Sequence, residues 1–290
     1  MKTPIIFIIF NRPEQTKKVF ETIKQAEPEK LIVVADGPRL HNQKDVINCP
    51  KTRKIIEGVD WKCQLIKEYS QKNLGCKKRI ATGIDKAFSL VDRAIILEDD
   101  CLPNFSFFKY CEELLEKYKN DKRIMSLTGD NFLFEKSNII DESYYFSKYP
   151  YIWGWATWRR AWKYCDVKMK LWPKLKKQKI FNRSWAKGFD KAYFNKIDTW
   201  DNQWVFTCLI QNGLTIVPNK NLVSNIGFDS EVTHTRVKTI VANMKTNNLK
   251  FPLIHPKTIM PNKKADKISQ SHFTNIGIIK DYIKNYFSRN

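Results

Sequence analysis

The sequence has no apolar run long enough to cross a membrane. Its apolar stretch near the N-terminus, residues 4–10, is ended by Asn11-Arg12-Pro13. A secretory signal or a transmembrane helix needs a longer run, and no later stretch approaches the roughly 18 apolar residues of a membrane span. We therefore expect a protein that is soluble or peripheral on a membrane.

The cysteines also lack any regular spacing. There are seven of them, an odd number, with no C-x-x-C pair and no Cys/His spacing typical of a metal site. This pattern argues against a disulfide framework and against a structural zinc site. It predicts reduced thiols and a cytoplasmic protein.

Acidic residues are scarce relative to basic ones. The chain has 51 Lys and Arg but only 30 Asp and Glu, a formal net charge of +21. Residues 159–200 contain thirteen Lys or Arg and three Asp. Such a surplus favours polyanionic partners, namely phosphate-bearing substrates, an anionic membrane surface or nucleic acid. A solvated lysine-rich surface is an equally good interpretation.

Short apolar strands alternate with amphipathic helices in the first half of the chain. The predicted strands are Ile5–Phe10, Leu31–Ala35, Gln64–Lys67 and Ala94–Leu97, and the predicted helices are 13–26, 54–59, 76–90 and 105–118. This order predicts an α/β fold with a doubly wound, mostly parallel sheet. With 290 residues, of which 42% are apolar, the chain can bury a full core.

The second half is less periodic. We expect a helix from Asp201 to about Gln211, a strand at Leu214–Val217 and a loop from Asn219 to His234. The predicted organisation is a domain over 1–240, with a nucleotide-binding half over 1–130 and an acceptor half over 131–240. A basic tail over 241–290 follows, with an amphipathic helix at 276–287 that favours a membrane contact or packs against the protein.

Three consecutive carboxylates, Glu98-Asp99-Asp100, follow the fourth predicted strand. Ligands of doubly wound sheets bind beyond the carboxyl ends of the strands. Carboxylates this close together repel one another unless a cation joins them, and Mn²⁺ or Mg²⁺ takes such oxygen ligands and bridges to a diphosphate. The alternative is an exposed acidic turn or a cap for the next helix.

Polar residues also follow the first two strands. Asn11 and Arg12 can supply a donor and a cation to a nucleotide, and Asp36 can accept hydrogen bonds from a ribose or a base. A helix cap before Pro13 and an Asp-Gly turn are equal alternatives. The turn at residues 73–75, with Lys77 and Arg79, can approach phosphates, although a plain turn with solvated lysines is favoured there.

Asp201 lies between Trp200 and Trp204, and partial desolvation by indole rings raises a carboxylate's pKa toward that of a useful base. Asp198 competes for this role. As a helix N-cap, Asp201 would have no catalytic function, and the residue chemistry alone slightly favours that interpretation.

Two further groups are candidates with structural alternatives. His234 is either a metal or phosphate ligand or a structural histidine, which is the commoner case. Trp153, Gly154 and Trp155 either form a platform for a sugar or belong to a tightly packed core.

The ordered series of these segments resembles the GT-A glycosyltransferases. Glu98-Asp99-Asp100 with Pro103 and Phe105 is similar to the metal-binding segment of the N-acetylglucosaminyltransferase I family. The segments 151–158 and 200–204 are similar to its Gly-Trp and Trp/Asp segments, and bacterial relatives in polysaccharide clusters share the Asn-Arg-Pro opening. The resemblance covers residues 4 to 235. One departure is that the family's adjacent Asp pair is here Asp201-Asn202, with Gln203 before the next Trp.

The resemblance implies an inverting transferase that uses a nucleotide-sugar, with a UDP-sugar as the expected donor, and Mn²⁺ or Mg²⁺. It makes Asp100 the metal ligand, places Glu98 and Asp99 near the nucleotide and reverses the preference at Asp201 in favour of the catalytic base. The expected acceptor is a glycan or a lipid-linked glycan in surface polysaccharide or lipopolysaccharide synthesis, at the cytoplasmic face of the membrane.

Two alternatives come from other classes. A sugar-phosphate nucleotidyltransferase would share the sheet and the metal, but residues 10–13 lack the glycine-rich phosphate loop that such enzymes usually have. A non-catalytic, basic nucleic-acid-binding protein is compatible with the charge of +21. Carboxylates at the strand ends would oppose nucleic-acid binding, so no nucleic-acid partner is expected.

Overall fold

A computed structural model describes residues 1–229, 241 and 243–271 of the chain. The strands among these residues are β1 (Ile5–Ile9), β2 (Lys30–Ala35), β3 (Gln64–Tyr69), β4 (Arg93–Glu98), β5 (Cys101–Pro103), β6 (Ile124–Thr128), β7 (Tyr144–Ser147), β8 (Trp155–Trp158), β9 (Leu214–Pro218) and β10 (Val223–Asn225).

The α-helices are α1 (Pro13–Ala26), α2 (Gln43–Ile55), α3 (Cys76–Leu90), α4 (Phe105–Lys117), α5 (Arg159–Trp162), α6 (Trp172–Lys177), α7 (Arg183–Tyr193) and α8 (Asp201–Ile210). Short 3₁₀ turns lie at Ile56–Gly58, Phe134–Ile139 and Gly227–Asp229. A further helix spans 263–271.

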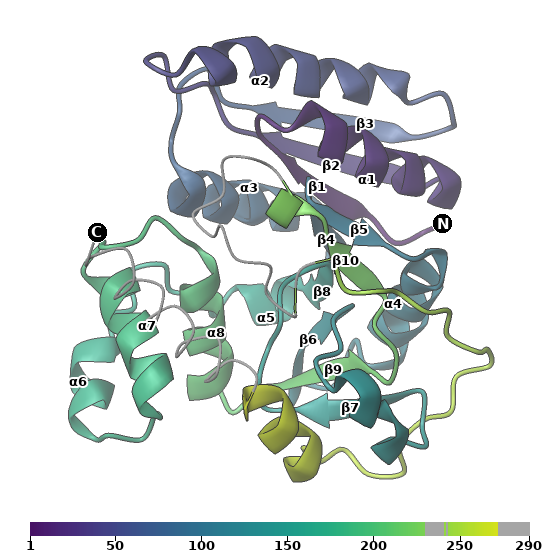
Figure 1. The fold of residues 1–290 in the computed structure, drawn as a ribbon, viewed down its shortest axis with the longest axis vertical. Helices are drawn as coiled ribbons and strands as arrows, with labels where there is room; N and C mark the ends of the chain where they lie inside the picture. The colour runs from purple at the N-terminus through teal and green to yellow at the C-terminus, as the bar shows by residue number, and fades with distance from the viewer. Residues whose placement is uncertain (230–240, 242, 272–290) are drawn as a thin grey trace.

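Eight strands form one sheet in the order β3-β2-β1-β4-β8-β6-β9-β7, and β5 and β10 form a separate antiparallel pair (Figure 1). The pairs β1–β2, β2–β3, β1–β4 and β6–β9 are parallel. β8 is antiparallel to both β4 and β6, so β4 and β6 point the same way. The carboxyl ends of β1, β2, β4 and β6 therefore meet at one rim.

Helices cover both faces of the sheet because successive strand side chains point to opposite sides. Ile5, Phe7 and Ile9 of β1 pack in the same apolar cluster as residues of α1 and α4. Ile6 and Ile8 pack on the other face, with α3, α5 and α8. The predicted α/β class with a doubly wound, mostly parallel sheet is confirmed.

Most predicted elements of the first half are present, but one helix was mostly missed. The predicted helix over 54–59 is only the end of α2 and the turn after it, and α2 begins at Gln43, where the Asn42 side chain caps the Asp45 N–H. The buried face of α2 consists of Asp45, Cys49 and Thr52, which give it no apolar stripe. The predicted loop after Asn219 also contains β10.

Part of the predicted C-terminal tail packs onto the main body. Leu249 and Leu253 are buried in the cluster that covers one face of the sheet. The Leu249 N–H donates to Ser106 Oγ at 3.2 Å, and Pro261 forms a parallel bridge with Phe146 of β7. The amphipathic segment 276–287 lies outside the described residues.

No helix in the described part of the chain is long and apolar enough to span a bilayer. All seven cysteines lie within that part, and each is a free thiol, as predicted.

Candidate functional site

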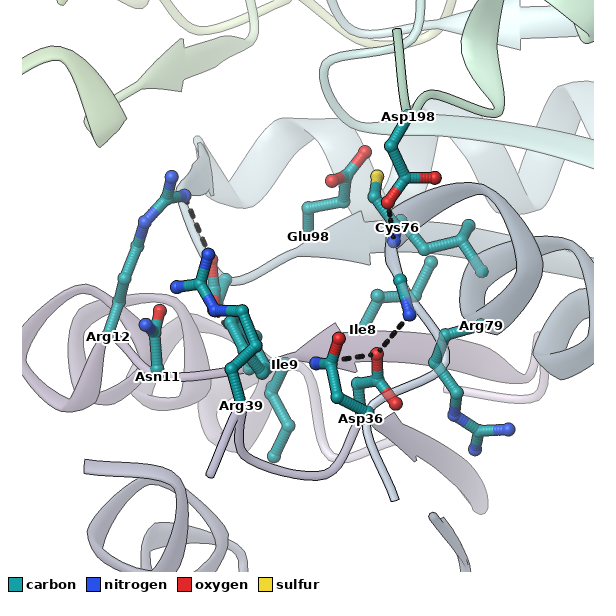
Figure 2. A pocket seen from close by; sticks show the side chains of 15 residues that line it. Ile8, Ile9, Asn11, Arg12, Asp36, Arg39, Cys76, Arg79, Glu98 and Asp198 are labelled. Carbon is teal, nitrogen blue, oxygen red and sulfur yellow. Dashed lines mark hydrogen bonds and ion pairs between the residues drawn. The ribbon is translucent and has the colours of Figure 1, made fainter. Parts of the chain in front are cut away.

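A cavity of about 310 Å³ lies at the rim formed by the ends of β1, β2 and β4 (Figure 2). Its walls contain all five residues predicted to face a nucleotide: Asn11, Arg12, Asp36, Glu98 and Asp99. Strand ends explain this convergence, since Asn11 and Arg12 follow β1, Asp36 follows β2, and β4 ends at Glu98. The rim is the place where doubly wound sheets bind their ligands.

Arg12 joins two of the three consecutive carboxylates. Its Nη1 lies 2.5 Å from Asp100 Oδ2 and 3.3 Å from Asp99 Oδ1. Asp99 also accepts the Phe10 N–H at 3.0 Å. Glu98 accepts no hydrogen bond from the described residues, and its side chain points away from Arg12, toward Cys76 and Asp198 (Figure 2). One guanidinium therefore pairs with two of the three carboxylates, and Glu98 has no ion pair among the described residues.

This imbalance shifts the pKa values of the cluster. Burial, then the charges of Asp100, Asp99 and Asp201, raises the pKa of Glu98 to about 8. Burial is also the largest cause for Asp99, whose pKa is raised to about 6 although Arg12 opposes the shift. Burial alone would lower the pKa of Arg12, but the charges of Asp99 and Asp100 raise it instead. When ionised, the three carboxylates therefore carry more negative charge than Arg12 neutralises.

The charge of the cluster fits a divalent cation, and the geometry limits how the protein can hold one. No three His, Cys, Asp or Glu side chains in the described part of the chain converge as a complete ligand set. Asp100 would therefore be a protein ligand to an ion whose other ligands come from a bound diphosphate and water, as is usual for Mg²⁺. The predicted ligand His234 lies outside the described residues.

The backbone after β10 also meets Asp100. The Ile226 N–H donates to the Asp100 carbonyl at 2.8 Å, in line with the pairing of Asn225 with Cys101. A Cβ added to Gly227 would collide with the Asp100 carboxylate. The residues that follow β10 therefore lie directly against Asp100, the predicted metal ligand.

Asp36 holds the neighbouring turn in place. Its two oxygens accept the N–H groups of Gly37, Leu74 and Gly75 at 2.9–3.0 Å and the Asn73 Nδ2 at 3.1 Å. A carboxylate has about four lone-pair sites, so these bonds saturate it. A ribose or base that donates to Asp36 would have to compete with these donors, and Asp36 shapes the wall of the cavity by holding the turn.

Asp198 occupies the start of α3. Its carboxylate accepts the Cys76 N–H at 2.8 Å and the Lys77 N–H at 3.0 Å. Gly75 has a φ of +81°, and a Cβ there would lie 2.6 Å from Asp198 Oδ2. The amides that sequence reasoning offered to phosphates at this turn are thus already paired with Asp36 and Asp198.

Asp201 is the first residue of α8, and one of its oxygens stays unpaired by the described residues. Oδ1 accepts the Asn202 N–H at 2.7 Å and the Thr199 hydroxyl, whereas no described residue donates a hydrogen bond to Oδ2. Its charge contributes to the raised pKa of Glu98, which places Asp201 beside the acidic cluster. Asp198, in contrast, uses both oxygens as a helix cap.

Trp155 does not form an exposed platform. It is fully buried and packs against Trp162, Trp200 and Trp204, with ring centroids 5.4–6.1 Å apart. For Trp155 the packing alternative is correct, because β8 runs through the centre of the sheet. Trp153 is only half-buried and contacts Phe228, with ring centroids 5.7 Å apart. Gly154 has a φ of +64°, and its backbone packs against Val223.

Arg39 is a cavity residue that sequence reasoning missed. It lines the cavity and pairs with the buried Asp45, whose other oxygen accepts Asn11 Nδ2 at 2.6 Å. The loop that carries Arg39 has no periodic signal. Arg79, considered from the sequence as a cation near phosphates, and Asp198, considered as an alternative base, also line the cavity.

Comparisons with known proteins identify no family for this chain. No protein-family model matches it, and no curated protein sequence does. Among solved structures, an apo UDP-glucose pyrophosphorylase is similar at 13% identity and a TM-score of 0.41, covering 75% of this chain and 90% of that chain. Mouse xyloside xylosyltransferase 1, in its apo form, is similar at 11% identity and a TM-score of 0.35, covering 72% and 81%.

A UDP-glucose pyrophosphorylase complexed with UDP-glucose matches at 15% identity and a TM-score of 0.29 over 52% of this chain. This chain spans 64% of that protein, which is less than two thirds of its length. Likeness at this level assigns no activity, so the function has to be argued from the cavity itself.

Proposed function

We propose that this protein is an inverting, metal-dependent glycosyltransferase of the GT-A type. Its donor would be a nucleotide-diphosphate sugar, with a UDP-sugar as the first candidate, and its acceptor a glycan or lipid-linked glycan of surface polysaccharide or lipopolysaccharide synthesis. The observation that supports this most directly is the rim cavity, which combines arginines with a carboxylate cluster whose charge is only partly neutralised.

The donor would bind with its diphosphate between the arginines and the cluster. Arg12 and Arg39 line one side of the cavity, and Glu98 lies toward its other side, near Cys76 and Asp198 (Figure 2). Asp100 would hold Mn²⁺ or Mg²⁺, with Glu98 and Asp99 nearby. When bound, the ion would offset the charge that develops on the leaving nucleotide. Arginine suits a diphosphate because its planar fork donates two parallel hydrogen bonds.

Asp201 would act as the base. Its Oδ2, to which no described residue donates, would accept the proton of an acceptor hydroxyl as that oxygen attacks the anomeric carbon of the sugar and the nucleotide diphosphate leaves. The Asn202 N–H and the Thr199 hydroxyl hold Oδ1 and so fix the direction of the carboxylate. A single displacement inverts the anomeric centre. Trp153 would be available to the acceptor sugar, whereas Trp155 is not.

The test of the base is Asp201→Asn. We expect the variant to keep its Tm and its thermal stabilisation by UDP-sugar with Mn²⁺, while sugar transfer falls by roughly 10²–10⁴-fold. Asp60→Asn, a change at a side chain that is 63% exposed, is the matched control and should leave transfer unchanged. A variant that melts lower and keeps its turnover would show that Asp201 is only a helix cap.

The test of the metal role is Asp100→Asn. Mn²⁺-dependent release of UDP from the donor should be lost, and Mn²⁺ should no longer increase the Tm in the presence of UDP. Retained activity would contradict the assignment. Incubation with UDP-sugar and pyrophosphate separates the alternatives, because formation of UTP would identify a nucleotidyltransferase instead.

A further inference from the structure

The segment around α6 forms a surface of one charge sign. Residues 168–183, here called the α6 surface, contain seven basic side chains and no acidic one: Lys168, Lys170, Lys174, Lys176, Lys177, Lys179 and Arg183. All seven are exposed. Lys176 is paired, with its Nζ 2.8 Å from Asp190 Oδ1.

Two aliphatic side chains lie exposed among these charges. Leu171 directly precedes α6 and is 51% exposed, and Ile180 follows α6 and is 60% exposed. Lys170 and Lys179 directly precede them in the sequence, and both lysines are exposed. Exposed aliphatic side chains cost free energy in water, and their occurrence within a lysine-rich exposed segment is typical of interfacial membrane contacts.

The surface is held rigid from below. Trp172 is buried and packs against Phe189 and Phe206, with ring centroids 5.3 and 5.9 Å away. Its Nε1 donates to Asp190 Oδ1 at 3.0 Å, which ties α6 to α7. α6 and α7 lie at an outer corner of the molecule, away from the central sheet (Figure 1). The aliphatic tips are therefore presented outward by a folded support.

From this pattern we infer that the α6 surface docks onto an anionic lipid bilayer. The lysines would be attracted to the negative headgroups, and Leu171 and Ile180 would enter the interface between headgroups and acyl chains. Nucleic acid fits less well. Proteins that bind single-stranded nucleic acid stack its bases on exposed aromatic rings. The rings of this segment, Trp172 and Phe181, pack instead into an apolar cluster.

The docking itself does not depend on the proposed function, since it can be measured without any substrate.

The experiment is co-sedimentation of the full chain with vesicles at low salt. Vesicles contain either phosphatidylcholine alone or phosphatidylcholine with about 30% phosphatidylglycerol, an anionic fraction large enough to attract lysines. We expect binding only to the anionic vesicles, with a loss at high salt. The double variant Leu171→Ser and Ile180→Ser should reduce the partition coefficient about tenfold or more.

Matched control variants separate the effect of the α6 surface from that of the protein's net charge and overall apolar exposure. The double variant Leu40→Ser and Ile254→Ser removes a Leu and an Ile that lie outside the α6 surface and are 83% and 61% exposed, and it should not change binding. Lys174→Glu with Lys177→Glu should abolish binding, whereas Lys17→Glu with Lys18→Glu on α1 lowers the net charge equally and should reduce it only slightly.

Three outcomes would overturn the inference: no binding to anionic vesicles, equal effects of the test and control pairs, or tighter binding of a single-stranded oligonucleotide that depends on the same α6 residues. The Tm of each variant should match that of the unchanged chain, since all of the substituted side chains are exposed.

Discussion

At the residue scale, the three consecutive carboxylates Glu98, Asp99 and Asp100 lower the stability of the fold, and the same negative charge attracts protons and cations. Asp99 is almost fully buried, and Arg12 is the cation that contacts it. Glu98 has no hydrogen-bond partner among the described residues. Buried carboxylates without enough compensating charge take up protons more readily than free ones. The cluster should therefore respond to pH and to added cations in a way that an ordinary surface group does not.

The first prediction concerns the pH dependence of stability without metal. The pKa of Glu98 is raised from 4.5 to about 8 and that of Asp99 from 3.8 to about 6, mainly by burial. The folded state thus binds more protons than the unfolded state across this window, so the free energy of unfolding should fall as the pH rises from about 4.5 to 8. The Tm in EDTA, measured at several pH values, tests this.

Glu98→Gln removes the group with the larger pKa shift, so the free energy of unfolding should fall less steeply with rising pH. Glu57→Gln, at a side chain that is 61% exposed, is the control and should keep the slope of the unchanged chain. Adding Mn²⁺ with UDP should increase the Tm most at the upper end of the window, where protons no longer compete. An unchanged slope in Glu98→Gln would contradict the raised pKa.

At the scale of elements, helix α3 depends on a residue far away in sequence. Gly75 supplies no side-chain cap to α3. Asp198, more than a hundred positions later, supplies the missing acceptor for the first N–H groups of the helix. A negative charge at a helix N-terminus also complements the helix dipole. The start of α3 is therefore complete only when the segment before α8 is in place.

The second prediction follows from this cap. Asp198→Ala should lower the free energy of unfolding by about 1 kcal/mol, the usual cost of losing an N-cap side chain. Asp166→Ala is the matched control, because it removes another carboxylate that accepts backbone N–H groups, those of Lys168 and Lys170, away from the cavity. Urea unfolding measures the loss of stability in each variant. In addition, only Asp198→Ala should weaken binding of UDP, because only Asp198 lines the cavity. Unchanged stability and binding would contradict the capping role.

The elements that were predicted from sequence are those whose local pattern agrees with their environment. α1 and α3 were predicted with the bounds that they have, because each has a continuous apolar stripe and because Pro13 marks the start of α1. β7 and β10 were not anticipated. Both are short, and what makes them strands is pairing with distant partners, β9 and β5, which no local pattern reveals.

The site was predictable to the same extent. Residues that directly follow strands, such as Arg12 and Asp99, were found because parallel strands end at a common rim. What each residue does there depends on neighbours that sequence spacing cannot give. Asp36, for example, lines the cavity, but its oxygens also accept the N–H groups of Leu74 and Gly75 in the turn after β3, which no spacing predicts.

At the scale of the whole molecule, the segment 243–271 packs back onto the main body. It lies against α4 through Leu249 and against β7 through Pro261. His255 Nδ1 lies 2.9 Å from the Tyr144 hydroxyl, which in turn lies 2.6 Å from the Tyr118 hydroxyl. These contacts join the end of the described chain to β7 and to the residue that follows α4. The segment should therefore unfold together with the main sheet.

The third prediction tests that cooperativity. Leu249→Ala and Leu253→Ala should each destabilise the protein by about 2–3 kcal/mol, as expected for truncating a buried leucine. The neighbouring Ile254→Ala, at a side chain that is 61% exposed, should change the free energy of unfolding by less than about 0.5 kcal/mol. Urea denaturation should show one transition for all three. A separate early transition, altered only by the leucine variants, would mean that this segment unfolds independently.

The bridge from Arg12 to Asp99 and Asp100 gives the cavity its own counter-ion. If Asp100 holds the metal as proposed, a divalent ion would compete with this guanidinium for Asp100 Oδ2. The guanidinium would then be available to pair with a diphosphate bound in the cavity. Ion and nucleotide would then strengthen each other's binding, and by thermodynamic reciprocity the gain would be the same in either order of addition.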